Sequence, residues 1–130
     1  MKTWILALSL AGAAALGALG AEPVKNVLKD IPYADGALGR RMLVDEKHLL
    51  IMQVALKPGQ QVPLHTANSN VHLLVIEGQI VATVAGKDTP AVQGDLLPVA
   101  FRSPMSLRND SKENASLLVL KSPNPSEMKP

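Results

Sequence analysis

From residue 40 onward the sequence is built of short apolar runs, and turn-forming residues interrupt them every 6 to 12 positions. The longest run, residues 48–57, has about ten residues and ends at Pro58 and Gly59. Proline and glycine together stop a helix and favour a tight turn. An apolar run of this length with such an end favours a strand buried on both faces. The chain is therefore predicted to fold as strands joined by tight turns.

The remaining apolar runs give the same pattern. We expect strands at residues 40–44, 48–57, 62–65, 71–76, 79–85, 89–92, 96–99, 105–108 and 115–121. Short strands at this spacing, with almost no helix, are typical of a β-sandwich or a β-barrel. In a closed barrel every strand edge is paired, and the inward aliphatic side chains fill or line the interior. We predict an all-β fold with one barrel domain over residues 40–121.

Residues 1–21 are expected to lie outside that domain. Lys2 gives a positive start, and an apolar stretch of small residues follows, which Ser9 alone interrupts before the Ala-rich end. These features predict a secretory signal peptide, removed on export to the periplasm or the medium. An uncleaved membrane anchor is the alternative, since a run of about 18 residues is just long enough to span.

The segments on either side of the predicted barrel are rich in proline and glycine. Residues 22–39 have little periodicity and predict an extended arm. Residues 122–130 contain three prolines and predict a loose tail. A chain of 130 residues without a composition break in its middle is expected to form one domain.

Composition excludes several classes of function. No cysteine is present, so disulfides, thiolate metal sites, cysteine nucleophiles and a lipid-modified cysteine are all excluded. After loss of Lys2, twelve basic residues nearly balance eleven acidic ones, and no basic run predicts nucleic-acid binding. Tyr33 and Phe101 are the aromatic residues of the mature chain, too few for a surface that stacks sugars or bases. No Gly-x-Ser-x-Gly elbow is present, so nucleophilic catalysis has no support.

Two glycine-led stretches carry a resemblance to a known family. The first runs from Gly59 through His65 to Gly78, and the second runs from Gly94 to Asn109. Their spacings resemble the two motifs of the cupins, and the resemblance covers residues 49–121. It implies a small jelly-roll β-barrel with a ligand pocket at its mouth. It also implies a homodimer, because small cupins often pair through their sheets.

The cupin metal site takes two histidines and a glutamate from the first motif and a histidine from the second. His65 keeps the first of these positions, whereas Ala67, Val71 and Met105 stand at the other three. One imidazole does not hold a divalent ion, which needs about three or four good donors. No cofactor is therefore expected, and the metal-dependent activities of the family are doubtful here.

His72 leaves an alternative open. Counted forward from His65 it would take the glutamate position, but counted back from Gly78 that position is Val71. A shift of one residue reverses the face of a strand side chain, and we expect His72 to point away from the cavity. A β-bulge near Asn70 would turn it inward.

With His72 inward, His65, His72 and Met105 would form a soft donor set for copper or zinc. Met52 would add a second thioether. The opposing interpretation treats these methionines as flexible core fillers, the usual role of a buried methionine.

Several polar residues are candidates for contacts with a small polar ligand. Asn68, Ser69 and Asn70 form a polar loop beside His65. Gln53 lies within the most apolar strand, where its amide needs a ligand, His65 or backbone as a partner. The second motif has alanine and arginine where the family has proline and glycine, and that arginine, Arg102, could attract an anion.

The hypothesis that combines these points is an exported, non-catalytic module that binds or senses a small polar molecule. His65, Asn68, Asn70, Gln53 and Arg102 would contact that ligand. The first alternative is a copper or zinc protein, with or without enzymatic activity, that uses His65, His72 and Met105. The second is a structural partner protein that acts through its 22–39 arm.

Overall fold

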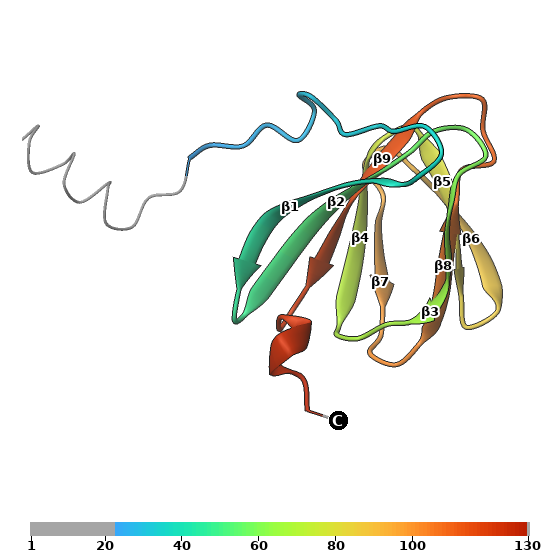
Figure 1. Cartoon of the computed structure of the whole chain (residues 1–130). Helices are drawn as coiled ribbons and strands as arrows, with labels where there is room; N and C mark the ends of the chain where they lie inside the picture. Colours follow the sequence, from blue (N-terminus) through green and yellow to red (C-terminus); the bar gives the residue numbers. More distant parts are fainter. Residues whose placement is uncertain (1–22, 130) are drawn as a thin grey trace, which may run out of the picture.

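The computed structural model describes residues 23–129, so the predicted signal peptide lies outside the described residues. The described chain forms nine strands and one short 3-10 helix (Figure 1). In chain order the elements are β1 (Gly39–Glu46), β2 (Leu49–Leu56), β3 (Gln61–Thr66), β4 (Val71–Glu77), β5 (Gln79–Val84), β6 (Lys87–Val92), β7 (Leu96–Val99), β8 (Pro104–Arg108), β9 (Ala115–Lys121) and η1 (Pro125–Glu127). Each predicted strand is confirmed, with ends that differ by a few residues.

The strands form two antiparallel sheets that face each other. One sheet has the order β1-β2-β9-β4-β7, and the other has the order β3-β8-β5-β6. The expected jelly roll is confirmed, whereas the expected closed barrel is corrected, because the strands of residues 23–129 form two separately paired sheets. Within the four-stranded sheet, the pairing of β3 with β8 shifts between Val62 and His65. Pro63 lies at this shift and has no N–H to donate, so the ladder is interrupted there.

The core lies between the sheets and is aliphatic. In β4 the buried residues Val71, Leu73 and Val75 alternate with more accessible ones, and the exposed His72 is among these. Alternation of this kind places one face of the strand on the core and the other outside. Residues contributed by both sheets complete the cluster: Val54, Leu56, Ala67, Ile80, Ala82, Ala91, Val99, Met105, Leu107, Ala115 and Leu117.

β2 is buried on both faces at its C-terminal end, as the run 48–57 predicts. Val54 belongs to the core between the sheets, whereas the neighbouring Gln53 faces the N-terminal arm. The arm crosses the top of the five-stranded sheet in Figure 1. Gln53 donates to the Val27 carbonyl oxygen at 2.7 Å, and Arg41 donates to the carbonyl oxygens of Lys29 and Asp30 at 3.0 Å. The arm, which has a turn at residues 27–28 and no helix or strand before residue 39, is therefore fastened to the sheet through its backbone.

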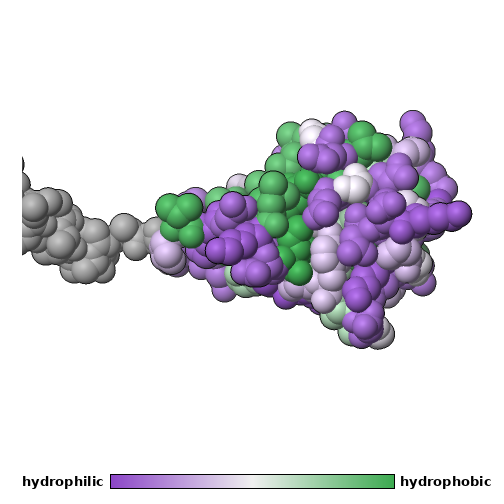
Figure 2. Space-filling view, turned by 90° about the horizontal axis from the view of Figure 1, so that it is seen from above, coloured by the Kyte–Doolittle hydropathy of each residue, from purple (hydrophilic) through white to green (hydrophobic). Residues whose placement is uncertain are grey.

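A phenol–carboxylate contact adds a further link between the arm and the sheet. The Tyr33 hydroxyl lies 3.3 Å from Glu77 Oε2, and burial together with this carboxylate raises the pKa of Tyr33 to about 12. From above, Figure 2 shows a hydrophobic band where the arm meets the sheets, with hydrophilic residues on either side.

The homodimer that the family resemblance implies stays a prediction.

The C-terminal tail differs from the expectation of a loose segment. Asn124 is 7% exposed, and its Nδ2 donates to Asp45 Oδ1 at 2.7 Å and to the Glu46 carbonyl oxygen at 3.1 Å. Its backbone N–H donates to the Lys47 carbonyl oxygen. Prolines disfavour regular structure, but they do not prevent the tail from packing on the sheet. Here Asn124 forms hydrogen bonds with three residues at the β1–β2 turn. The tail is therefore anchored up to η1.

Within residues 23–129, no helix has both the length and the apolar character that a membrane crossing requires.

Candidate functional site

A cavity of about 360 Å³ opens between the two sheets. Its size falls at the lower end of the range for small-molecule sites. The apolar lining residues are Met52, Val54, Val62, Pro63, Leu64, Ala67, Val71, Met105, Leu107 and Val119, and the polar ones are Arg40, His65, Asn68 and Lys121. The lining thus comes from six strands of both sheets and from the loop after β3. It is aliphatic, with a few polar groups and no carboxylate.

Strand register explains why Lys121 lines this cavity. Lys121 closes β9 and pairs with Val71 of β4, whose side chain lines the cavity from the neighbouring strand. Directly paired residues in a sheet share a face, so both side chains point toward the space between the sheets. Lys121 Nζ donates to Asn68 Oδ1 at 2.9 Å, and burial lowers the pKa of Lys121.

His65 lies at the cavity rim on β3, opposite Met105 of β8. Its Nδ1 is 2.9 Å from the Pro63 carbonyl oxygen. A carbonyl oxygen can only accept, so Nδ1 carries the proton in this contact, and Nε2 of the neutral ring is left as an acceptor. The side chain is exposed to solvent and can meet a molecule that enters the cavity.

The residues present do not fit the metal that the cupin fold implies. Val71 and Ala67 line the cavity at two of the positions where the family has oxygen or nitrogen donors. The pairing of β4 with β9 runs without a shift from Val71 to Val75, so no bulge turns His72 inward. His65 and Met105 are neighbours, whereas His72 lies on the outer face of its sheet. Among the described residues, no three histidine or acidic side chains converge on one point.

Gln53 is not at the cavity, in contrast to the expectation that it could face the ligand. It is fully buried on the opposite face of β2. Its Oε1 accepts from Arg41 Nε at 2.7 Å, and its Nε2 donates to the Ser116 hydroxyl at 3.0 Å. Neighbouring residues of a strand point to opposite faces, and Met52 and Val54 occupy the inward positions. The amide of Gln53 is satisfied by structural partners.

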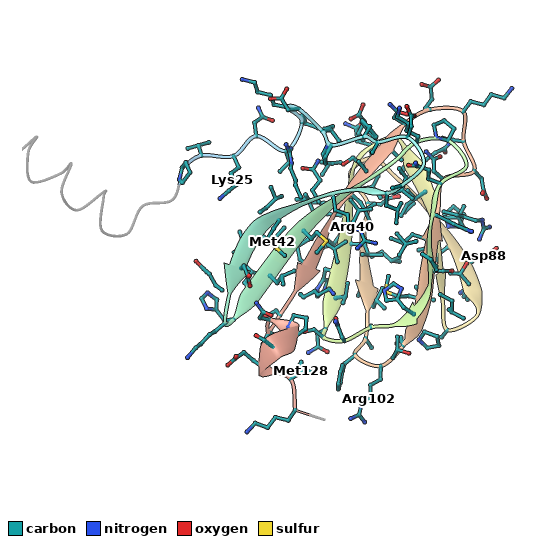
Figure 3. All side chains as sticks on the ribbon, viewed as in Figure 1. Lys25, Arg40, Met42, Asp88, Arg102 and Met128 are labelled. Carbon is teal, nitrogen blue, oxygen red and sulfur yellow. The ribbon has the colours of Figure 1, made fainter. Side chains whose placement is uncertain are left out.

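Two further candidates lie outside the cavity lining. Asn70 is exposed, and its Nδ2 contacts the Ser122 carbonyl oxygen at 3.4 Å. The Arg102 guanidinium stacks on the Phe101 ring, 4.9 Å from its centroid. In Figure 3, Arg102 projects from the lower rim of the fold, whereas Arg40 lies beside the space between the sheets. Of the five predicted ligand contacts, the structure brings His65 and Asn68 together at the cavity.

The backbone of Arg102 is in the left-handed region, with φ of 71°. Arginine stands where the cupin motif has glycine, a residue that adopts this backbone conformation without strain. We expect Arg102→Gly to raise the free energy of unfolding by up to about 1 kcal/mol. A left-handed backbone costs a residue other than glycine about 1–2 kcal/mol, and the larger entropy that glycine gains on unfolding offsets part of this benefit. Urea unfolding measures the change, and a loss of stability would contradict it.

Sequence reasoning missed Lys121 and Arg40 as cavity residues. The signal for Lys121 was available, because side chains alternate between the two faces of a strand, which places Lys121 on the same face as Leu117 and Val119. Arg40 is paired with Val54 of β2, another cavity residue. Its position could not be read from the sequence, since the pairing partner of β1 was not known there.

Comparison with known proteins identifies the family. No family model matches the chain. The uncharacterized protein MJ0764 of Methanocaldococcus jannaschii is 30% identical over 87 residues, which cover 66% of this chain and 75% of that protein. Its crystal structure, described as an RmlC-like cupin family protein with a double-stranded β-helix fold, superposes with a TM-score of 0.71 over 83% of this chain and 96% of that one. The chain belongs to the cupin family.

Other solved structures share the fold of this cupin at lower identity. TT1209 of Thermus thermophilus is 22% identical, with a TM-score of 0.73 over 78% of this chain and 98% of that one. An RmlC-like cupin of Desulfovibrio desulfuricans is also 22% identical, with a TM-score of 0.71 over 78% and 97%. At this identity the likeness establishes the fold alone. The present cupin therefore shares its scaffold with these proteins.

Proposed function

We propose that this cupin is an exported, non-catalytic module that binds a small molecule with both polar and apolar parts in the cavity between its sheets. The cavity itself carries the proposal: about 360 Å³, aliphatic walls, and polar groups confined to a few positions. Sites of this composition bury the body of a ligand and orient it through a small number of hydrogen bonds.

The polar groups at the rim support a binding role. His65 Nε2 is left as an acceptor by the contact of Nδ1 with the Pro63 carbonyl oxygen. Asn68 accepts from Lys121 through its Oδ1, whereas its Nδ2 makes no hydrogen bond within residues 23–129. A ligand at the rim can therefore meet an acceptor and a donor on adjacent chain segments. Groups arranged for nucleophilic attack are not part of this lining, which favours binding over catalysis.

A metal-dependent function is the competing proposal, and one observation decides how it is tested. His65 and Met105 are neighbours across the β3–β8 ladder, but the third member of the set, His72, lies on the other face of its sheet. Metal analysis of the purified protein after incubation with copper or zinc should show no stoichiometric ion. An ion retained by the protein and lost in His65→Ala would favour the metalloprotein instead.

Binding in the cavity is tested with four defined probes: hexanoate, benzoate, hexanamide and benzamide. Backbone-amide NMR titrations should show shifts at cavity residues for at least one of them. Removal of the imidazole in His65→Ala should weaken that binding about fivefold, the value of one net hydrogen bond of about 1 kcal/mol.

His48→Ala is the matched control, because the His48 side chain is 81% exposed and does not line the cavity. It should bind each probe with unchanged affinity. The absence of shifts at the cavity for all four probes would overturn the proposed function.

A further inference from the structure

We propose that the ligand is an organic anion, a small carboxylate with an apolar body, and that Lys121 is its anchor. This inference rests on the proposed binding function and names the chemical class that the cavity selects. It goes beyond the expectation from sequence, in which the candidate polar groups were neutral apart from Arg102.

The charge of the lining carries the inference. Two cationic side chains, Arg40 and Lys121, line the cavity, and no aspartate or glutamate does. Among residues 23–129 neither cation forms an ion pair with a carboxylate, although Lys57 and Arg108 do. The Lys121 side chain is partly buried at the rim, so its ammonium group loses part of its hydration, and an opposite charge would offset that loss. A carboxylate on the ligand would supply the missing charge.

The surroundings of Lys121 are shaped for a carboxylate. Nζ has three protons and gives one of them to Asn68 Oδ1. Two Nζ donors remain, and Asn68 carries a further donor, Nδ2, on the amide that Lys121 contacts, so this pair of side chains offers donors for both oxygens of a carboxylate. Val71, the register partner of Lys121, and Val119 on the same strand supply apolar surface beside this donor pair. Burial lowers the pKa of Lys121, and a bound carboxylate would raise it again.

Arg40 lies at a different part of the lining. It pairs with Val54 of β2, whereas Lys121 pairs with Leu50 of the same strand, four residues away. We therefore do not expect the two cations to bind the same carboxylate group. Arg40 adds to the positive potential of the cavity and so favours entry of an anion, an effect that salt screens.

The test compares each carboxylate with the amide of the same shape, near neutral pH, by the NMR titrations described above. Hexanoate and benzoate should bind about tenfold more tightly than hexanamide and benzamide, because a charge-assisted hydrogen bond replaces a neutral one. Lys121→Met keeps an unbranched apolar side chain and should remove this preference. Lys112→Met, a change at an exposed loop lysine, should leave it intact.

The outcomes separate the two proposals. Shifts at the cavity with equal affinity for acid and amide would overturn the anion inference and keep the binding function. An acid preference of undiminished size in Lys121→Met would also overturn the inference, since Lys121 would then not be the anchor of the carboxylate. No shifts for any probe would overturn both proposals. The acid–amide comparison on the unchanged protein stays decisive if Lys121→Met fails to fold.

Discussion

Replacing Gly78 with alanine is expected to lower the free energy of unfolding by about 4 kcal/mol, at the upper end of single-residue effects. Gly78 forms the tight turn between β4 and β5, with φ of 72°. A Cβ atom there would lie 2.2 Å from the Asn114 carbonyl oxygen and 2.9 Å from Ala115 Cα. Both neighbours are backbone, so the clash is relieved only by moving the start of β9.

Gly86→Ala is the matched control for this change. Its φ of 80° gives a similar conformational cost, but a Cβ atom there would have nothing within 4 Å. We expect Gly86→Ala to cost about 1 kcal/mol, the penalty for a left-handed backbone alone. Urea unfolding followed by circular dichroism gives both values. Equal losses in the two variants would show that the contact with Asn114 is not what requires glycine at position 78.

Replacing Asn109 with alanine is expected to cost about 3 kcal/mol, because it leaves buried polar groups without partners. Asn109 is fully buried, and its Nδ2 donates to the carbonyl oxygens of Leu56 and Glu113 at 3.0 and 2.8 Å. Its Oδ1 accepts from the Ser111 N–H and hydroxyl at 3.0 and 2.7 Å. One amide thus joins the end of β2 to the loop that leads into β9.

The same denaturant titration checks this second value. Asn114→Ala, in the same loop but exposed, should change stability by less than about 0.5 kcal/mol. Asn109→Asp should be at least as damaging as alanine near neutral pH, because it directs a carboxylate at two carbonyl oxygens. A stable Asn109→Asp protein would contradict the assignment of the amide as a donor to Leu56 and Glu113.

Much of the fold could be predicted from the sequence, because apolar runs and the turn residues between them are local features that indicate strands. The predicted strand 71–76 is observed as Val71–Glu77, and the hairpin at Glu77 and Gly78 is where the turn lies. The choice between Val71 and His72 for the inward position was also correct, since a fixed period of two lets the count from Gly78 decide it. Pro63 lies in the edge strand β3, where a residue without an N–H is tolerated.

The candidate site was less accessible from the sequence. Gln53 was placed at the ligand because it interrupts an apolar run. It lies between Met52 and Val54 in the strand, however, so its side chain points to the opposite face, under the arm. Asn124 was assigned to a loose tail, although its partners lie nearly eighty residues earlier, in the β1–β2 turn. Such contacts depend on which strands become neighbours, and the local pattern does not contain that information.

The sequence by itself determined the all-β architecture, the cupin turns and the loss of the family's metal ligands, because each of these is a matter of residue type at a fixed spacing. The tertiary structure decided which side chains share the cavity. Arg40, His65, Asn68 and Lys121 come from distant parts of the chain, and only the pairing of β1 with β2, β3 with β8 and β9 with β4 brings them to one lining. The charge of the cavity is therefore a property of strand order and register, which local propensity cannot express.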